Sequence, residues 1–411
     1  MLGKSLRNLG WLIASRGVNA AFSLIYLALT TRILGPVEFG RFALIVVMAQ
    51  AVAGLASFST WQPVVHWGTH QELRSTAIGF AVSLDLASIA GGSLLALVAA
   101  WSAPAWLPLP PELRWTALAL CLVALCAVRS TPTGILRLHN RYDLATGAEA
   151  IQPCIRAAGA IVAAGAFPTI SGFVCAWAVA ELACAATYWR LALRLEPVRL
   201  ADISLCRLPA EQPGAWRFVW GTSLSRSLAV SAKQIVLLMV GMLSGPLIAG
   251  GFRVASQLGQ ALVQLAEAIS RALYPELVRA GDQALSLARR MALLALAAGA
   301  LAVLATILGG KTIVTIVAGQ QFTYIQGALT LFAIGGAIDL VAAIADALLV
   351  ARGKAMSALA LRAVPLAVAL TMLPFALDYA GLSGAALCVA VSSAAAASAL
   401  CCMAFGRRVS R

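Results

Sequence analysis

Long apolar stretches separated by short polar or charged segments run along the whole chain. Each stretch is close to the ~20 mainly apolar residues that a helix needs to cross the ~30 Å hydrocarbon core of a bilayer. The pattern therefore predicts an all-α polytopic membrane protein with about twelve transmembrane helices. The predicted spans are 9–31, 42–65, 77–101, 115–136, 145–167, 170–193, 214–243, 246–273, 289–309, 324–350, 355–377 and 380–405.

The longest polar gap divides these spans into two sets of six. We predict an N-terminal six-helix bundle over residues 1–193, a cytoplasmic linker over 194–213 and a C-terminal six-helix bundle over 214–411. Most Lys and Arg residues lie near alternate connections, on the side of the N-terminus. Because basic residues concentrate on the cytoplasmic side of membrane proteins, both termini are predicted to be cytoplasmic. The opposite side holds Arg32, Arg41, Arg114 and Lys311.

The composition excludes a soluble globular enzyme. The 411 residues are 61% hydrophobic and 11% charged, and the mean hydropathy is +0.89. A net charge of +14 is scattered between apolar runs, which favours cytoplasmic loops over a nucleic-acid surface, so no nucleic acid is expected as a partner. The basic start at Lys4 and Arg7 resembles a signal peptide, but the apolar run extends to Thr31 without a convincing cleavage site and is interpreted as a retained first helix.

Residues that carry chemistry are few. Eight of the nine cysteines lie in apolar stretches and are interpreted as small buried hydrophobes, and three histidines provide no zinc ligand set. No phosphate-binding GxxxxGK[ST] pattern and no catalytic Ser/His/Asp or Cys/His set occurs. The sequence therefore predicts no catalytic residues, no metal site and no cofactor, and it does not favour an enzyme.

The two halves repeat each other at an offset of 210 positions. This offset places Ser15-Arg16 on Ser225-Arg226 and the Gly35-Pro36 turn on Gly245-Pro246. Two independent turns would also explain the Gly-Pro pairs. The shared spacing between arginine and turn favours duplication, and parallel six-helix repeats are an arrangement used for alternating access around a central site.

Several predicted spans carry polar residues on one helical face. In the first span these are Arg16, Asn19, Ser23, Tyr26 and Thr30; in the seventh, Arg226 and Lys233; in the eighth, Arg253, Gln257, Gln260, Gln264, Glu267 and Arg271. Glu149 and Arg156, and Asp339 and Asp346, also share faces of the fifth and tenth spans. Such faces favour a shared hydrated cavity, although polar groups also join helices to one another without any role in transport.

The first, seventh and eighth spans are locally positive. Together they hold Arg16, Arg226, Lys233 and Arg253 against Glu267 alone, and guanidinium groups match phosphate or pyrophosphate oxygens. Intramembrane acids, among them Asp85, Glu267 and Asp339, are candidates for ion coupling, or they simply neutralise the bases. The residues leave these two possibilities open.

Motifs along the whole chain resemble the Wzx-type oligosaccharide-lipid flippases of bacterial polysaccharide biosynthesis. The resemblance rests on Arg32-Ile33-Leu34-Gly35-Pro36-Val37-Glu38-Phe39-Gly40-Arg41-Phe42-Ala43-Leu44, Arg253-Val254-Ala255-Ser256, Arg271-Ala272-Leu273-Tyr274-Pro275-Glu276-Leu277, Val317-Ala318-Gly319-Gln320-Gln321-Phe322 and Leu349-Val350-Ala351-Arg352-Gly353-Lys354, in this order. It implies the multidrug/oligosaccharidyl-lipid/polysaccharide exporter fold, in which two six-helix bundles form a V that opens to either side of the bacterial inner membrane.

The resemblance also implies a substrate and site residues. The substrate is a polyprenyl-pyrophosphate-linked oligosaccharide, moved to the outer leaflet for O-antigen, capsule or exopolysaccharide. Arg16 and Arg226 are assigned to the pyrophosphate, and Lys233 and Arg253 to the same cavity, which Asn19, Gln257, Gln260 and Gln264 also line. Asp85, Glu267 and Asp339 are the ion-coupling candidates. Expected partners are the lipid-linked glycan, membrane lipids, a polysaccharide polymerase and glycosyltransferases.

Two alternatives remain from the residues. A drug/cation antiporter of the same superfamily needs an acidic cavity, against which the clustered bases argue. A non-transporting membrane partner in glycan assembly predicts that apolar replacements in the polar stripe preserve function, whereas the flippase hypothesis predicts their loss.

Overall fold

The computed structural model describes the backbone of residues 2–280, 284–351 and 355–405. Side chains are described from residue 21 onward, except at 225, 226, 228–233, 260–287, 350–356, 359 and 406–411. Within these ranges the chain is mainly helical and contains no β-strand. The predicted all-α fold class is confirmed.

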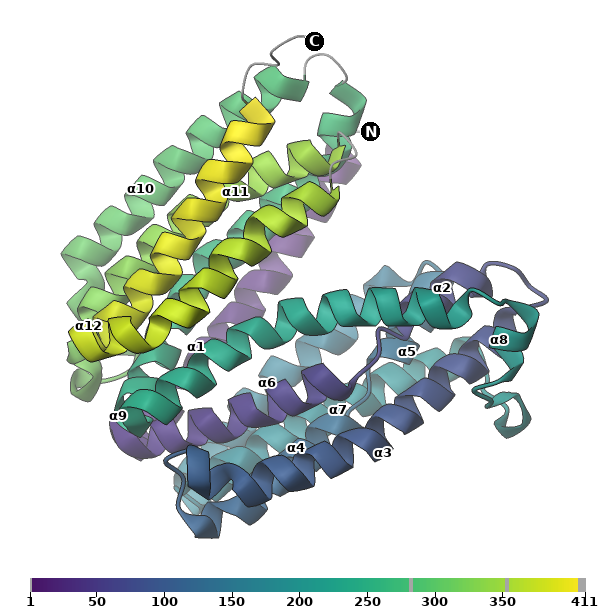
Figure 1. Ribbon diagram of the computed structural model, residues 1–411, viewed down its shortest axis with the longest axis horizontal. Helices are drawn as coiled ribbons and strands as arrows, with labels where there is room; N and C mark the ends of the chain where they lie inside the picture. The colour runs from purple at the N-terminus through teal and green to yellow at the C-terminus, as the bar shows by residue number, and fades with distance from the viewer. Residues whose placement is uncertain (1, 281–283, 352–354, 406–411) are drawn as a thin grey trace. The chain divides into compact units, whose positions relative to one another are not determined.

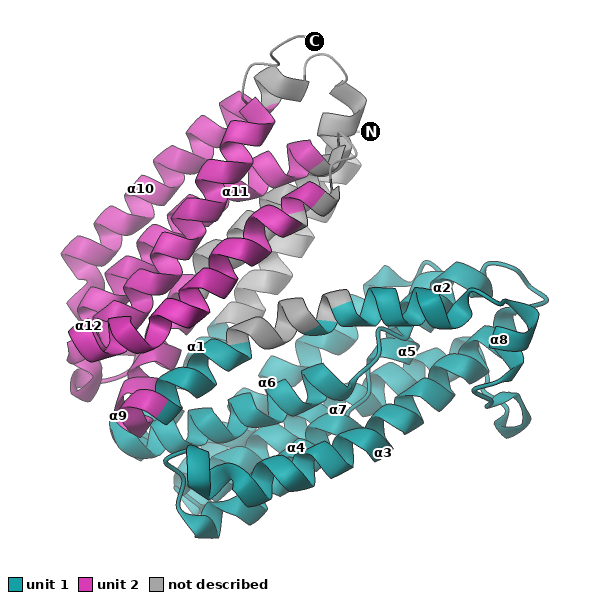
Figure 2. Ribbon diagram, in the orientation of Figure 1, with its two compact units in different colours: residues 1–242 teal, residues 243–411 magenta. Residues whose placement is uncertain are grey.

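The chain divides into two compact units, residues 1–242 and 243–411 (Figure 2). Unit 1 contains α1 (Leu2–Ala56), α2 (Trp61–Gly68), α3 (Arg74–Trp106), η1 (Pro111–Leu113), α4 (Arg114–Cys126), α5 (Ser130–Leu138), α6 (Tyr142–Ala166), α7 (Ile170–Leu195), η2 (Leu200–Asp202), α8 (Arg207–Glu211) and the first part of α9 (Ala215–Ala280). Figure 1 shows α3, α4, α6 and α7 running alongside one another.

Unit 2 contains the rest of α9, α10 (Ala284–Val317), η4 (Gln320–Ile325), α11 (Gln326–Ala351) and α12 (Ala355–Phe405). The helix α11 packs against both α10 and α12 (Figure 1). Small residues allow close approach here. A Cβ added to Gly299 would lie 2.7 Å from the Cβ of Ala337, so α10 and α11 are nearly in backbone contact.

Two glycines bend α1 and α9 in the same way. Gly35 has φ 69° and ψ 175°, and Gly245 has φ 81° and ψ 178°. This region of backbone space is essentially restricted to glycine, and the proline that follows each is suited to the first position of the next helix. The two turns that the sequence aligns at an offset of 210 thus share one conformation, which favours the predicted duplication.

Eight segments of the described residues are long and apolar enough to cross a membrane. Two of them, Ala21–Gly68 and Ala360–Phe405, have 48 and 46 residues, about twice the length of one crossing. The first bends at Gly35, and the second contains the non-helical residues Ala380 and Gly381. Division at these positions and at Gly245 gives eleven segments, and α6 (Tyr142–Ala166), with 25 residues, makes twelve, in agreement with the sequence.

The unit boundary and the predicted linker fall at different places. The compact units meet inside α9, next to its bend at Gly245, whereas the linker was predicted at 194–213. The linker region contains η2 and α8, and its backbone packs on α3: a Cβ added to Gly79 would lie 1.9 Å from the carbonyl oxygen of Asp202. The predicted halves, 1–193 and 214–411, stay a prediction that rests on the sequence repeat.

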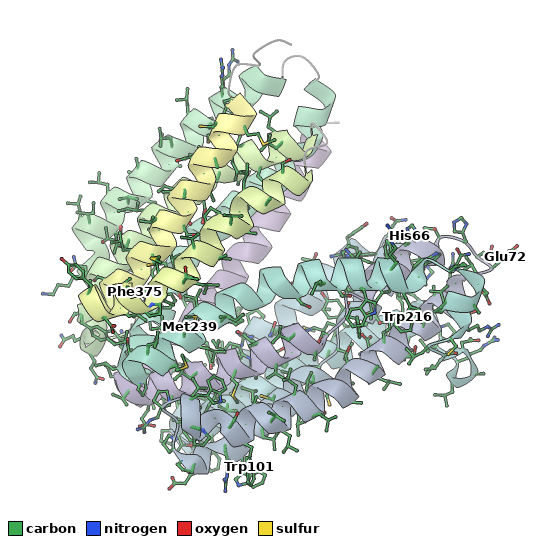
Figure 3. All side chains as sticks on the ribbon, viewed as in Figure 1. His66, Glu72, Trp101, Trp216, Met239 and Phe375 are labelled. Carbon is green, nitrogen blue, oxygen red and sulfur yellow. The ribbon has the colours of Figure 1, made fainter. Side chains whose placement is uncertain are left out.

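Aromatic side chains mark both ends of unit 1 (Figure 3). At one end the Arg114 guanidinium lies 4.9 Å from the ring centroid of Trp101 and 5.6 Å from that of Trp115. At the other end Trp216 packs edge-on against Phe80. Tryptophans are typical of membrane–water interfaces, so their positions fit the crossing direction that the hydropathy predicts.

One predicted span is interrupted. The apolar stretch 115–136 forms two helices, α4 and α5, because Ala127 leaves helical geometry (φ −76°, ψ 51°). Pro132 lacks the N–H that would have bonded back to Val128, and the Val128 carbonyl instead accepts a hydrogen bond of 3.0 Å from the Trp189 indole. The predicted span is retained as one apolar segment, Pro111–Leu138, but its helix is broken over residues 127–129, just before the turn that contains Pro132.

The cysteines are only partly buried. All nine are free thiols; Cys121 and Cys184 are buried, whereas Cys126, Cys175, Cys206 and Cys402 are exposed. The interpretation of the cysteines as buried small residues therefore holds for a minority, because helices that face lipid present small apolar residues outward as well as inward.

Candidate functional site

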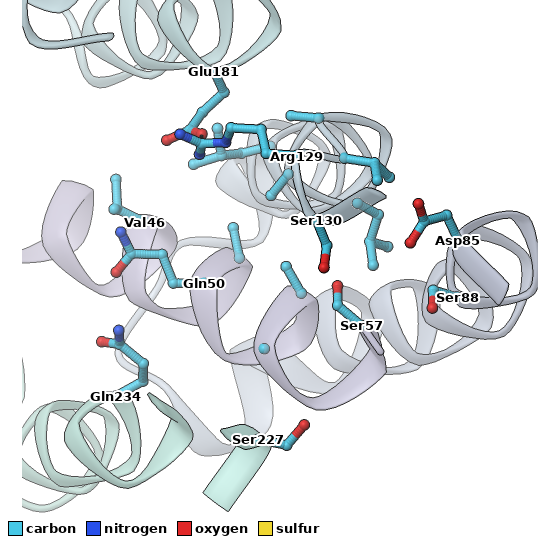
Figure 4. A pocket seen from close by; sticks show the side chains of 18 of the residues that line it. Val46, Gln50, Ser57, Asp85, Ser88, Arg129, Ser130, Glu181, Ser227 and Gln234 are labelled. Carbon is cyan, nitrogen blue, oxygen red and sulfur yellow. Dashed lines mark hydrogen bonds and ion pairs between the residues drawn. The ribbon is translucent and has the colours of Figure 1, made fainter. Parts of the chain in front are cut away.

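A polar cavity of about 380 Å³ lies inside unit 1 (Figure 4). Its size falls within the ~300–1,000 Å³ range of small-molecule sites. Its walls come from α1, α3, α4, α6, α7, α9 and the two breaks between consecutive helices. The polar side chains that line it are Gln50, Ser57, Asp85, Ser88, Arg129, Ser130, Gln152, Glu181, Ser227 and Gln234.

One wall is an ion-pair network around Glu181. The Glu181 carboxylate, on α7, accepts hydrogen bonds from the Arg129 guanidinium, from the Gln152 amide and, at 3.1 Å, from the Trp177 indole N–H. Arg156 lies 3.7 Å from the same carboxylate. The Glu181 side chain is 10% exposed, so two guanidinium groups share one nearly buried carboxylate.

Aromatic rings hold the second of these arginines. The Arg156 guanidinium carbon lies 3.7 Å from the Trp177 ring centroid and 5.7 Å from that of Tyr26. The two rings pack edge to face with centroids 5.6 Å apart. A guanidinium over aromatic faces is electrostatically stabilised, and Arg156 is thereby fixed behind the cavity wall.

The opposite wall is formed where two helices break. The gap between α1 and α2 and the gap between α4 and α5 are each followed by a short helix with proline at its third position, Pro63 and Pro132. The amide of Trp61 donates a 3.1 Å hydrogen bond to the Ser130 hydroxyl, which joins the two breaks.

Asp85 of α3 anchors both breaks. Its carboxylate accepts a 3.0 Å hydrogen bond from the Thr60 hydroxyl, at the start of α2, and another from the Thr131 hydroxyl, at the start of α5. The side chain is buried. A carboxylate at two helix N-termini is also favoured by the partial positive charge of their free N–H groups.

The remaining wall carries neutral polar groups. Gln50 of α1 and Gln234 of α9 project from neighbouring helices in Figure 4, and in the described part of the chain neither amide hydrogen-bonds to a protein group. Phe58 and Trp177 supply aromatic surface. Among the side chains that the structure describes, this wall therefore offers donors and acceptors without a protein partner.

Few of the sequence-predicted site residues lie among the described side chains. The side chains of Arg16, Asn19, Arg226, Lys233, Gln260, Gln264 and Glu267 lie outside them. Asp85 lies on the unit 1 cavity. Arg253 and Gln257 are half-buried on the part of α9 in unit 2, and Asp339 of α11 accepts a 3.3 Å hydrogen bond from Ser393 of α12. Only Asp85 is thus placed at the described cavity.

Two same-face pairs find partners on other helices. Arg156 pairs with Glu181 of α7, and Asp346 lies 3.5 Å from Arg362 of α12. These contacts join neighbouring helices, as the structural alternative for the intramembrane charges predicts.

The sequence reasoning missed most of the cavity. By the charge pattern, Arg129 is one of the basic residues near the predicted cytoplasmic connections, and Gln50, Gln152 and Gln234 do not stand out in the sequence. Pro132 carries the signal that places Arg129: a proline inside an apolar stretch starts a new helix, and residues just before such a start lie at a break. No comparable signal marks the glutamines.

The long apolar helices, bundled around a cavity with charged and amide groups, define a multi-pass helical membrane protein. Two solved structures share this fold. A multidrug resistance transporter of the MATE family and MOP superfamily, in an inward-facing conformation, has a TM-score of 0.67 at 15% identity, over 93% of this chain and 91% of that one. The lipid II flippase MurJ, in an inward closed conformation, has a TM-score of 0.68 at 12% identity, over 94% and 86%.

The chain belongs to the family of polysaccharide biosynthesis proteins, whose pattern matches residues 29–326. It is also 31% identical to the inner membrane protein YghQ of Escherichia coli K12 over 335 residues. The matched region covers 77% of this chain and 93% of that protein. The resemblance identified in the sequence is confirmed at the level of family and superfamily fold, and the protein is a multi-pass membrane protein.

Proposed function

We propose that this protein is a flippase that moves a polyprenyl-pyrophosphate-linked oligosaccharide from the cytoplasmic to the outer leaflet of the inner membrane for surface polysaccharide synthesis. The observation that carries the proposal is the match to polysaccharide biosynthesis proteins over residues 29–326. The fold shared with a lipid II flippase supports transport rather than catalysis. Both termini are cytoplasmic in this proposal, and the protein is not an enzyme.

The proposed mechanism assigns charge recognition to two arginines. Arg16 and Arg226 occupy equivalent positions in the sequence repeat and bind the pyrophosphate, to which guanidinium groups are matched in charge and geometry. Lys233, Arg253 and the glutamines at 257, 260 and 264 extend this polar path, together with Asn19. Substrate binding lowers the cost of closing the path around cations, so the ligand favours one conformational state by differential contacts.

Energy coupling is assigned to intramembrane acids. Glu267 and Asp339 are the remaining candidates, whereas Asp85 is held by two threonine hydroxyls at the helix breaks. The partners in this proposal are the lipid-linked glycan, membrane lipids, a polysaccharide polymerase and glycosyltransferases.

The test uses cells that lack the chromosomal copy and express variants at matched protein levels. Arg16→Ala and Arg226→Ala are compared with Arg16→Lys and Arg226→Lys, scoring surface polysaccharide and the lipid-linked intermediate on the cytoplasmic leaflet. We expect loss of polysaccharide, accumulation of the intermediate and partial rescue by Lys.

Arg194→Ala is the matched control, because Arg194 is an exposed arginine at the end of α7. Normal polysaccharide from stable Arg16→Ala and Arg226→Ala variants would contradict the proposal. The MATE fold favours one competing function, drug/cation antiport. Drug efflux by the native protein with an unchanged intermediate would support that function instead.

A further inference from the structure

The charged side chains that the structure describes on the unit 1 cavity already have protein partners. Glu181 is bound by Arg129 and Arg156, and Asp85 by the hydroxyls of Thr60 and Thr131. Each of these described charges is thus already held by groups of the protein. A ligand for this space therefore does not need a charge of its own, and an ionic ligand would have to compete with pairs that are already formed.

The groups left for a ligand are neutral and bifunctional. Each amide of Gln50 and Gln234 offers one oxygen acceptor and two N–H donors, and the hydroxyls of Ser57 and Ser227 also donate and accept. Polar groups that line a cavity without protein partners are satisfied by water or by a ligand. Their pattern fits a ligand with many hydroxyl groups, since each hydroxyl is itself donor and acceptor.

Aromatic surface completes the match. Phe58 and Trp177 line the same cavity, and the apolar C–H face of a sugar ring packs on such rings while its hydroxyls bond to amides at the edge. The Trp177 indole N–H is already bonded to Glu181, so this ring is fixed in place. The cavity volume of about 380 Å³ is suited to a short glycan segment rather than to a long oligosaccharide.

We propose that the unit 1 cavity binds an uncharged sugar of the glycan headgroup, with Gln50 and Gln234 as the hydrogen-bonding pair. This inference rests on the proposed flippase function and separates the recognition of sugar from that of pyrophosphate. Asp85 and Gln152 lie in the halves of α3 and α6 nearer their predicted cytoplasmic ends, the side from which the proposed substrate enters.

The test is saturation-transfer difference NMR on the purified full-length protein in detergent micelles. The probes are the methyl glycosides of glucose, galactose and N-acetylglucosamine, with methyl glucuronide as the charged comparison. We expect transfer to at least one neutral glycoside and weaker transfer to the glucuronide. Gln50→Leu and Gln234→Leu should each bind about tenfold more weakly, because loss of hydrogen bonds to one ligand group is of that order.

Gln71→Leu is the matched control, since Gln71 is exposed outside the cavity, and it should bind as the native protein does. Gln50→Asn and Gln234→Asn keep polarity but shorten the reach by one methylene, so they test the pair even if the Leu variants do not fold. Absence of transfer to every neutral glycoside, preference for the glucuronide, or native affinity in both folded pairs of variants would overturn the inference.

Cells distinguish the sugar subsite from the transport function. In the strain described above, folded Gln50 and Gln234 variants that have lost sugar binding should also accumulate lipid-linked intermediate, as the native protein does not. Full transport by variants that bind no sugar would overturn the proposed sugar subsite but would not contradict the flippase function. Absence of accumulated intermediate when the whole gene is deleted would overturn the flippase function. The NMR experiment tests sugar binding at the subsite independently of transport.

Discussion

Removal of the Glu181 carboxylate should destabilise unit 1 severely. In Glu181→Ala, the guanidinium groups of Arg129 and Arg156 lose their shared acceptor, and the Trp177 indole loses its partner. Removing one member of a buried ion pair costs about 3–5 kcal/mol because the other charge stays buried and unpaired. The Arg129 side chain is 31% exposed, so cavity water solvates it in part and the lower end, about 3 kcal/mol, is expected.

The assay is thermal unfolding of the detergent-purified protein, followed by helical circular dichroism. For a domain of this size a loss of 1 kcal/mol lowers Tm by about 2–4 °C, so Glu181→Ala should lower Tm by roughly 6–12 °C. Glu72→Ala is the control, because Glu72 is exposed at the end of unit 1 (Figure 3) and its loss should stay within about 0.5 kcal/mol.

A second variant separates charge from packing. In the double variant Glu181→Ala with Arg129→Met, one unpaired cation is removed together with the carboxylate, so the combined loss of stability should be smaller than the sum of the two single losses. A Tm for Glu181→Ala equal to that of Glu72→Ala, or strictly additive losses, would refute the assignment of the network as a coupled, buried ion-pair system.

Three further outcomes are expected. Gly245→Ala should cost about 1–3 kcal/mol because φ is 81° there, whereas Gly221→Ala, where an added Cβ meets open space, should be neutral or stabilising in the same unfolding assay. Asp85→Ala should lose about 2–3 kcal/mol by freeing two hydroxyls; native stability combined with loss of transport would instead indicate ion coupling. Hydrogen bonding from Arg141 lowers the pKa of Asp143, so this pair should stabilise the protein above the ordinary carboxyl pKa and lose that effect as pH falls through the lowered pKa. Asp143→Asn should therefore alter the acid limb of a plot of stability against pH, and at neutral and basic pH it should shift stability only by a constant amount.

The repeat and the crossings were accessible from sequence because both depend on local properties. A segment partitions into the bilayer according to its own length and apolar content, and Gly35 and Gly245 adopt their shared conformation because glycine alone tolerates it. The helix break just before Pro132 does not follow from the average apolar content of its segment, because a single proline there starts a new helix.

The cavity depended on tertiary structure. Arg129 and Glu181 are 52 positions apart in the sequence, and the Thr60 and Thr131 hydroxyls, from the starts of α2 and α5, hydrogen-bond to Asp85 of α3. Helical periodicity states which residues share a face but not which neighbouring helix that face meets. The sequence by itself thus determined the class, the crossings and the duplicated turns. Only the packing of unit 1 decided which groups bind its buried charges and that Gln50 and Gln234 face a common space, because such pairings depend on the relative rotation of separate helices.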